Sequence, residues 1–517
     1  MPLGKESHKR ASVSPDSYRS GGLKKLRFRQ IILILFAYSD FLLYLCPRKT
    51  TIIMNTSTTY LRRILFFLSV FSFQFSLFAA SPTRTLPIVY VNTDGKKAVS
   101  DTETQIPCGI YIDSVRAQYH SLGSAASPIR GTIKGRGNWT WNGFDKKPYK
   151  IKFDVKQKVL GMPNNRHWCL MAYADDYLGF LKGPAGFALS RAVGLRWTPR
   201  QVPVELVLNG KYMGLYFLTE HVRIASNRVH IHEQADQETH PDSISGGWLV
   251  EIDNYPSENN IEFYEGNGQH VMISLREPEV LSSAQRNYLE SQIAALNDAL
   301  YAPITNNQSP VTNLLDIDEA ARYYLVQEIM EDCESYHGSC FLYKDRDSLG
   351  VADKWKFGPV WDFGNAYDRR QETWIYENPT WPQYWIGQLA TIPEFKQAVS
   401  EQWYTFYHQY KDSVRTSIRT FADGIEQAAK RDAEVWRNTQ GYCDNSNYSD
   451  VRDRFFRRYD WRIGWLFSQW GEGQQPITQG FEEIPVNQVH CTKILREGHF
   501  LILRDGWTYT LQGQRIE

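Results

Sequence analysis

The fold is decided by residues 316–370, which read DIDEAARYYLVQEIMEDCESYHGSCFLYKDRDSLGVADKWKFGPVWDFGNAYDRR. Asp316 and Glu319 form a D-x-x-E start signal for a helix, and apolar residues then recur at helical spacing. An acidic cluster follows the expected helix. Two short aromatic segments, 340–344 and 355–361, then predict a β-hairpin that runs directly into a D-F-G triplet.

This order of elements matches what phosphoryl transfer requires. One carboxylate orients or deprotonates the attacking hydroxyl, and a second holds Mg²⁺ on the nucleotide phosphates. Protein kinases place the first on a loop after a helix and the second on a D-F-G turn after a strand hairpin. Glu334 and Asp362 have this layout. The plainer alternatives are a solvated loop acid at Glu334 and a turn-capping carboxylate at Asp362.

The composition indicates a globular protein with more than one lobe. The chain has 517 residues, which is too long for one ordinary core. Hydrophobic residues make up 42% and charged residues 22%, which excludes a wholly disordered chain. The net charge is +1, with 58 basic and 57 acidic residues, so the chain is not expected to bind nucleic acid or a membrane surface through bulk charge.

The seven cysteines form no C-x-x-C pair and no spacing with histidine that fits zinc. We therefore expect free buried thiols as the default. A disulfide between Cys333 and Cys340, across the acidic loop, is the alternative.

The first 80 residues predict export. Residues 1–53 are unlike the rest of the chain, and we interpret them as a mis-called extension before a true start at Met54. Residues 54–80 combine two arginines, an apolar run and a small-residue exit, the pattern of a secretory signal peptide. Its removal would leave no stable membrane span and deliver the protein outside the cytoplasm. A two-helix membrane anchor is the alternative.

The region before the central helix is rich in predicted strands. A strand at 129–134 runs into a Gly-Arg-Gly turn at 135–137, and residues 148–153 alternate with Lys150 and Lys152 on one face. A glycine-rich turn lets the backbone approach phosphates, and a lysine on the next strand can neutralise them. Such lysines are more often simply solvated. Asn-Gly at 209–210 predicts a type I′ hairpin.

Six sequence words, taken together and in order, resemble the CotH family of spore-coat-type, kinase-like proteins. They span residues 129–370 and read IKGRGNWTW, KKPYKIKF, LGMPNNRHWCLMAYADD, WTPRQVPVELVLNGKYMGLYFLTEHV, YYLVQEIM and FGPVWDFG. The resemblance implies an atypical protein kinase that phosphorylates Ser or Thr of extracytoplasmic proteins. Its implied cofactors are ATP and a divalent metal, Mg²⁺ or Mn²⁺.

The resemblance also implies roles for the acidic residues. Asp362 matches the metal-binding Asp that follows the P-x-W strand of the family. Glu334 stands where most members have Asp, which makes it the implied catalytic base, with Asp332 as the alternative. Glu is one methylene longer than Asp and moves the carboxylate by about 1 Å, a shift that can cost ~10²-fold in rate.

Further residues are implied for nucleotide binding. Lys152 is our choice for the catalytic lysine that contacts the phosphates, with Lys147 and Arg136 as alternatives. By analogy with kinases, the segment that contains Glu220 and Val222 would lie at the hinge and face the base.

The implied fold class is α+β, a two-lobed atypical kinase-like fold with a mostly β small lobe, a helical large lobe and a short β tail. We expect an N-terminal β region at 81–128, the small lobe at 129–235, the large lobe with the catalytic hairpin at 246–470, and the tail at 480–517. The tail is similar to the C-terminal elements of secreted proteins of Gram-negative bacteria, which agrees with a bacterial secreted or cell-surface location.

Three functions remain open at this point, of which one is a hydrolase or carbohydrate-binding protein that merely shares these sequence words. The retained Asp362 and the lysine-bearing strand favour a secreted protein kinase. Glu334 in place of Asp favours a catalytically inactive relative that serves as a scaffold or binding module of the cell envelope.

Overall fold

The fold is described from a computed structural model of the chain. The chain divides into two units, Met1–Thr83 and Arg84–Glu517, and only the second is described. The structure describes residues 84–476 except 116–118, 256–259, 307, 349, 369–371 and 379–382, together with strands at 492–496, 499–504 and 507–510. The expected extension at 1–53 and signal peptide at 54–80 lie outside the described residues.

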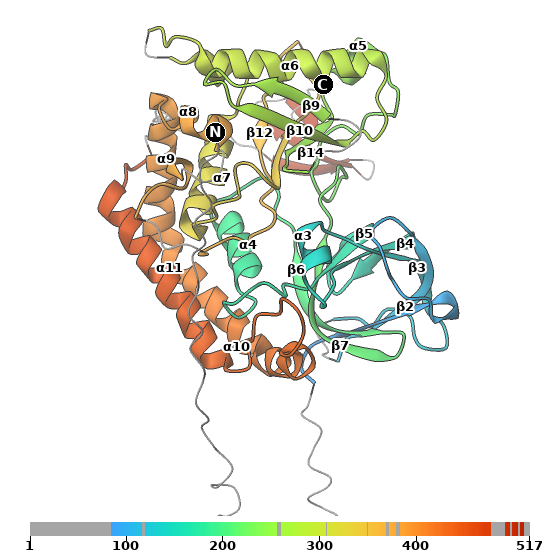
Figure 1. Cartoon of the computed structure of the whole chain (residues 1–517). Coiled ribbons are helices and arrows are strands. Elements are labelled where there is room, and N and C mark those ends of the chain that lie inside the picture. Colours follow the sequence, from blue (N-terminus) through green and yellow to red (C-terminus); the bar gives the residue numbers. More distant parts are fainter. Residues whose placement is uncertain are drawn as a thin grey trace, which may run out of the picture. The chain divides into compact units, whose positions relative to one another are not determined.

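The N-terminal half of the described chain is a closed seven-stranded barrel (Figure 1) with strand order β1-β2-β3-β4-β5-β7-β6. Parallel pairing of β1 with β6 closes the barrel, and all other neighbours are antiparallel. The strands of the expected region at 81–128 therefore share one sheet with those of the expected small lobe at 129–235. The barrel elements are β1 (Ile88–Thr93), the 3-10 turn η1 (Asp94–Lys96), β2 (Ile106–Asp113), β3 (Ile129–Gly135), β4 (Tyr149–Val159), β5 (Met162–Met171), β6 (Gln201–Leu208) and β7 (Lys211–Glu220), with a short helix α3 (Trp139–Gly143) between β3 and β4.

Residue alternation explains which way the barrel strands face. On β4, Ile151 and Phe153 are fully buried while Lys150 and Lys152 are half-buried on the opposite face, as predicted. The Asn209-Gly210 turn between β6 and β7 has positive φ at both residues, 53° and 83°, which confirms the predicted hairpin.

A second sheet has five antiparallel strands in the order β12-β11-β8-β10-β9. Helix α6 lies across it (Figure 1), with Tyr288 stacked on Trp248, and Ser282 closes its N-terminus with a capping box. The predicted strand at 340–344 is confirmed, but the one at 355–361 is wrong in extent, because Pro359 has no N–H for the ladder. The elements are α5 (Pro241–Ile244), β8 (Trp248–Ile252), β9 (Asn260–Tyr264), β10 (His270–Glu277), α6 (Ser283–Tyr301), β11 (Cys340–Lys344) and β12 (Lys356–Phe357).

Helices complete the core around α7 (Ile317–Met330). Asp316 accepts a hydrogen bond from the backbone N–H of Glu319 at 3.1 Å, which confirms the predicted helix start. α10 packs against the barrel, where Trp436 donates from Nε1 to the carbonyl of Met213 at 2.8 Å. The remaining helices are α4 (Lys182–Ala192), η2 (Pro310–Asn313), η3 (Ile375–Glu377), α8 (Tyr384–Leu389), α9 (Pro393–Thr405), the π-turn η4 (Phe406–Tyr410), α10 (Lys411–Trp436) and α11 (Tyr448–Trp470).

The tail forms a three-stranded antiparallel sheet from β13 (Thr492–Arg496), β14 (His499–Arg504) and β15 (Trp507–Thr510). The mixed α+β class predicted from the sequence is confirmed. Cys333 and Cys340 are both buried and neither is in a disulfide, so the alternative disulfide is wrong. Among the described helices, none has the length and apolar character needed to span a bilayer.

Candidate active site

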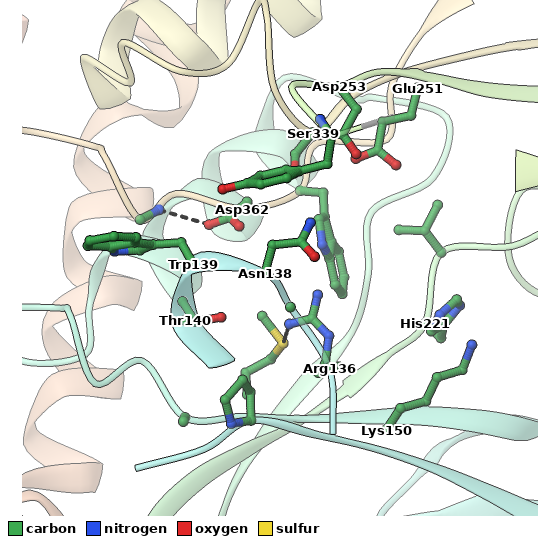
Figure 2. Close-up of a pocket in the computed structure, with 18 of the residues that line it drawn as sticks. Arg136, Asn138, Trp139, Thr140, Lys150, His221, Glu251, Asp253, Ser339 and Asp362 are labelled. Atoms are coloured by element: carbon green, nitrogen blue, oxygen red, sulfur yellow. Dashed lines mark hydrogen bonds between the residues drawn. The ribbon is translucent and has the colours of Figure 1, made fainter. Parts of the chain in front are cut away.

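A cavity of about 570 Å³ is lined by residues of the barrel, of the five-stranded sheet and of the loops that follow α7 and β12. This volume falls in the range of about 300–1,000 Å³ that is common for ligand pockets. Figure 2 shows Glu251, Asp253 and Ser339 on one side, and Arg136 and Lys150 on the other. The cavity therefore has a basic wall from the barrel, whereas on the sheet side Glu251 and Asp253 are both ion-paired with Arg276, which also lines the cavity.

Glu334 and Asp362, the two carboxylates predicted to converge, both line this cavity. Glu334 Oε2 accepts a hydrogen bond from Asn365, and Oε1 accepts a weaker one from Asn254 at 3.4 Å. Burial and the negative charge of Asp362 raise the pKa of Glu334 to about 7. Asp362 has a positive φ of 48° and accepts a hydrogen bond from the N–H of Gly364 at 3.0 Å, which fixes its carboxylate in the turn.

A third carboxylate, Asp175, was not predicted from the sequence. It follows β5, lines the cavity, and has its pKa raised to about 7 by burial and by the charge of Asp362. A Cβ placed on Gly364 would lie 3.1 Å from Asp175 Oδ2 and 3.2 Å from Asp362 Oδ1. The two carboxylates therefore approach the same point. Asp175 lies within the word LGMPNNRHWCLMAYADD, but its partner Asp362 is distant in the sequence, so the word alone does not predict that the two carboxylates meet.

These two carboxylates fit the needs of a magnesium ion on a nucleotide. Mg²⁺ is usually held by one or two protein carboxylates, with waters and substrate phosphates completing its octahedral shell. Within the described ranges there is no group of three or more His, Cys, Asp or Glu side chains placed to hold a metal by themselves. Asp362 and Asp175 would thus supply the protein ligands, and phosphate oxygens the remainder.

The lysine of β4 that lines the cavity is two positions before the one chosen from the sequence. Lys150 lines the cavity, whereas Lys152, on the same face of β4, does not. Burial lowers the pKa of Lys150. Lys147 also points elsewhere, since its ammonium group donates to the carbonyl of Trp141 and lies over that ring. Arg136, the other alternative, lines the cavity, and its guanidinium carbon lies 5.5 Å from the centre of the Trp361 ring.

Only some residues of the segment predicted to form the hinge line the cavity. Val222 lines the cavity together with His221 and His167, whereas Glu220 does not. Glu220 is fully buried and its Oε1 lies 2.7 Å from Arg228 Nη1, so it has a structural ion pair. Burial and the nearby positive charges lower the pKa of His167 to about 3, so this imidazole is neutral at pH 7.

Asp332, the alternative base, is buried and is not among the residues that line the cavity. Its Oδ1 accepts a hydrogen bond from the N–H of Glu334 at 3.3 Å. Burial and the charges of Glu334 and Asp362 raise its pKa well above the ordinary value. Asp332 thus supports the loop that presents Glu334.

A family model of the CotH kinase protein matches residues 133–461. The chain belongs to the CotH kinase family. Every residue that lines the cavity lies inside the matched range, so the cavity is part of the CotH domain. A search of curated proteins finds no match. Two barrel strands, β1 and β2, precede the CotH match although they pair within the same barrel.

Proposed function

We propose that this CotH family member is a protein kinase that transfers the γ-phosphate of ATP to a Ser or Thr hydroxyl of an extracytoplasmic protein. The observation that carries the proposal is that Glu334, Asp362 and Lys150 line one cavity. A general base, a metal-binding carboxylate and a cation for phosphates are the parts that phosphoryl transfer needs.

Each residue has a defined role in the proposed reaction. Glu334 accepts the proton of the attacking hydroxyl while the new O–P bond forms and the bond to the β-phosphate oxygen breaks, so that ADP leaves with the electron pair. Lys150 and Arg136 bind phosphate oxygens. Asp362 and Asp175 would hold Mg²⁺ or Mn²⁺, which neutralises phosphate charge when bound.

The wider layout supports the same proposal. The barrel would act as the small lobe, and the five-stranded sheet with α7 and the helices that follow would act as the large lobe. The adenine base of ATP would lie against Val222 and the neutral imidazoles of His167 and His221, away from the acidic residues of the sheet. The leader predicted at 54–80 supports a bacterial secreted or cell-surface location, where the substrate would be a protein rather than nucleic acid.

The proposal is tested with purified protein, γ-labelled ATP, Mg²⁺ or Mn²⁺, and a library of Ser- and Thr-containing peptides. We expect label on peptide with the wild type and none above background with Asp362→Ala. Asp460→Ala, which changes an exposed aspartate on α11, is the matched control and should keep wild-type transfer. Equal labelling by wild type and Asp362→Ala would contradict the proposal.

A catalytically inactive scaffold is the second candidate, and one observation favours it. Active protein kinases pair the phosphate lysine with a glutamate, whereas Lys150 has no ion pair among the residues that the structure describes. A wild type that binds Mg²⁺-ATP but labels no peptide would support this second function.

A further inference from the structure

Glu334 has a side chain one methylene longer than the aspartate expected at its position, and the surrounding loop has room for it. The carbonyl of Glu334 accepts a hydrogen bond from the N–H of Gly338 at 3.0 Å, so residue 338 lies one turn above it. A Cβ on Gly338 would lie 2.9 Å from Oε1 of Glu334 and 3.0 Å from Nδ2 of Asn254. Glycine at 338 therefore leaves space for the longer carboxylate and for the amide that donates to it.

Two amide side chains receive the longer carboxylate at its far end. Asn365, three residues after Asp362, donates to Oε2, and Asn254, in the loop after β8, donates to Oε1 at 3.4 Å. The two donors come from segments that are far apart in the sequence and reach the carboxylate from different elements. A contact of about 3.6 Å is no longer a hydrogen bond, so a carboxylate withdrawn by one methylene loses the contact with Asn254 and moves away from Asn365.

We infer that Gly338, Asn254 and Asn365 form a cradle that adapts this site to glutamate, so that Glu334 is the working carboxylate and aspartate there is a loss. The inference rests on the proposed kinase function and names the positioning residues of its base. It is the opposite of the expectation from the sequence that glutamate at 334 reduces activity. Asn254 and Asn365 position Glu334 and are not themselves expected to contact the substrate hydroxyl.

The first test is a double-mutant cycle in kcat and KM for ATP with the full chain, using Glu334→Asp, Asn365→Ala and the double variant. We expect Glu334→Asp to lower kcat ~10²-fold, because a displacement of about 1 Å at the reacting group has this order of effect. Asn365→Ala should lower kcat ~10-fold in the wild type and have a smaller effect in the Glu334→Asp background. KM for ATP should stay unchanged throughout, since the cradle does not contact the nucleotide.

Asn447→Ala is the matched control, because Asn447 also donates an amide hydrogen bond to a carboxylate, that of Asp450, outside the cavity. It should leave kcat unchanged. Glu334→Asp that equals or exceeds the wild type in kcat would overturn the cradle, as would an Asn365→Ala effect of the same size in both backgrounds.

The second test does not depend on activity. The same four proteins, unfolded in urea, should show coupling between positions 334 and 365 in the free energy of unfolding. Coupling with no transfer by the wild type would overturn the kinase function while leaving the contact intact. Coupling with transfer that Asn365→Ala does not slow would show a purely structural contact and would overturn the positioning role.

Discussion

The protein contains two groups of acids that have opposite surroundings. Asp432, fully buried on α10, accepts hydrogen bonds from Lys146 at 3.0 Å, Tyr442 at 2.7 Å and the N–H of Leu215 at 2.7 Å. In the cavity, Asp362 instead faces other carboxylates, and burial together with its charge raises the pKa of Asp175 to about 7. The comparison teaches that an acid surrounded by donors joins parts of the fold, whereas acids that repel one another are suited to a cation.

The largest expected effect concerns the paired group. Asp432→Ala leaves Lys146 buried without its partner and removes the tie between α10 and the barrel. Breaking a buried ion pair on one side costs about 3–5 kcal/mol, so the free energy of unfolding in urea should fall by that amount. The exposed pair of Arg415 with Asp460 is the control, and Asp460→Ala should cost less than about 1 kcal/mol. If Asp432→Ala and Asp460→Ala lowered the free energy of unfolding equally, Asp432 would not have the structural role given to it here.

The second effect concerns the cavity. Asp362→Ala should lower kcat by at least ~10²-fold, because it removes a group that stabilises charge in the reaction. The same change relieves repulsion with Glu334 and Asp175, so the free energy of unfolding should not decrease. Both quantities are measured on one preparation, by peptide labelling and by urea unfolding. A large loss of stability would place Asp362 with the structural acids.

Much of this contrast could be predicted from the sequence where the signal is local. The D-x-x-E start at Asp316, the Asn-Gly hairpin at 209–210 and the spacing of Glu334 and Asp362 depend on neighbouring residues or on one helix and one hairpin. The structure confirms the first two and brings the two carboxylates into one cavity.

The features that the sequence did not predict depend on contacts between segments that are remote in the sequence. Lys150 and Lys152 share one face of β4, and only the pairing of that strand with β5 in the closed barrel determines which lysine reaches the cavity. Asp175 meets Asp362 through contacts between segments that are remote in the sequence. The aromatic pattern of 355–361 predicts a longer strand than β12, which ends before Pro359.

The third effect tests the basic wall. Lys150→Ala should raise KM for ATP by ~10-fold, equivalent to about 1.4 kcal/mol, because it removes a cation from the cavity. Lys152→Ala is the matched control on the same strand face and should leave KM unchanged. Steady-state kinetics with varied ATP measure both. A larger effect from Lys152 would restore the assignment made from the sequence alone.

The smallest expected effect is on pH dependence. The pKa of Glu334 is raised from an ordinary 4.5 to about 7 in the folded protein, so the folded state binds more protons than the unfolded state between these values. Stability should therefore fall as pH rises from 4.5 to about 7, with the penalty fully present above that pH. Glu334→Gln should remove on the order of 1 kcal/mol of this dependence in urea unfolding, after allowance for solvent screening. Parallel pH curves for the two proteins would contradict the assignment.

The central claim is tested most directly by the free energy of unfolding of wild type and Asp362→Ala, each with and without Mg²⁺-ATP. A ligand at 100 times its Kd stabilises the folded state by about 2.7 kcal/mol. We predict that Mg²⁺-ATP stabilises the wild type by this order and leaves Asp362→Ala unchanged, while the two proteins have similar stability without ligand. Equal stabilisation of both proteins by Mg²⁺-ATP would contradict the account.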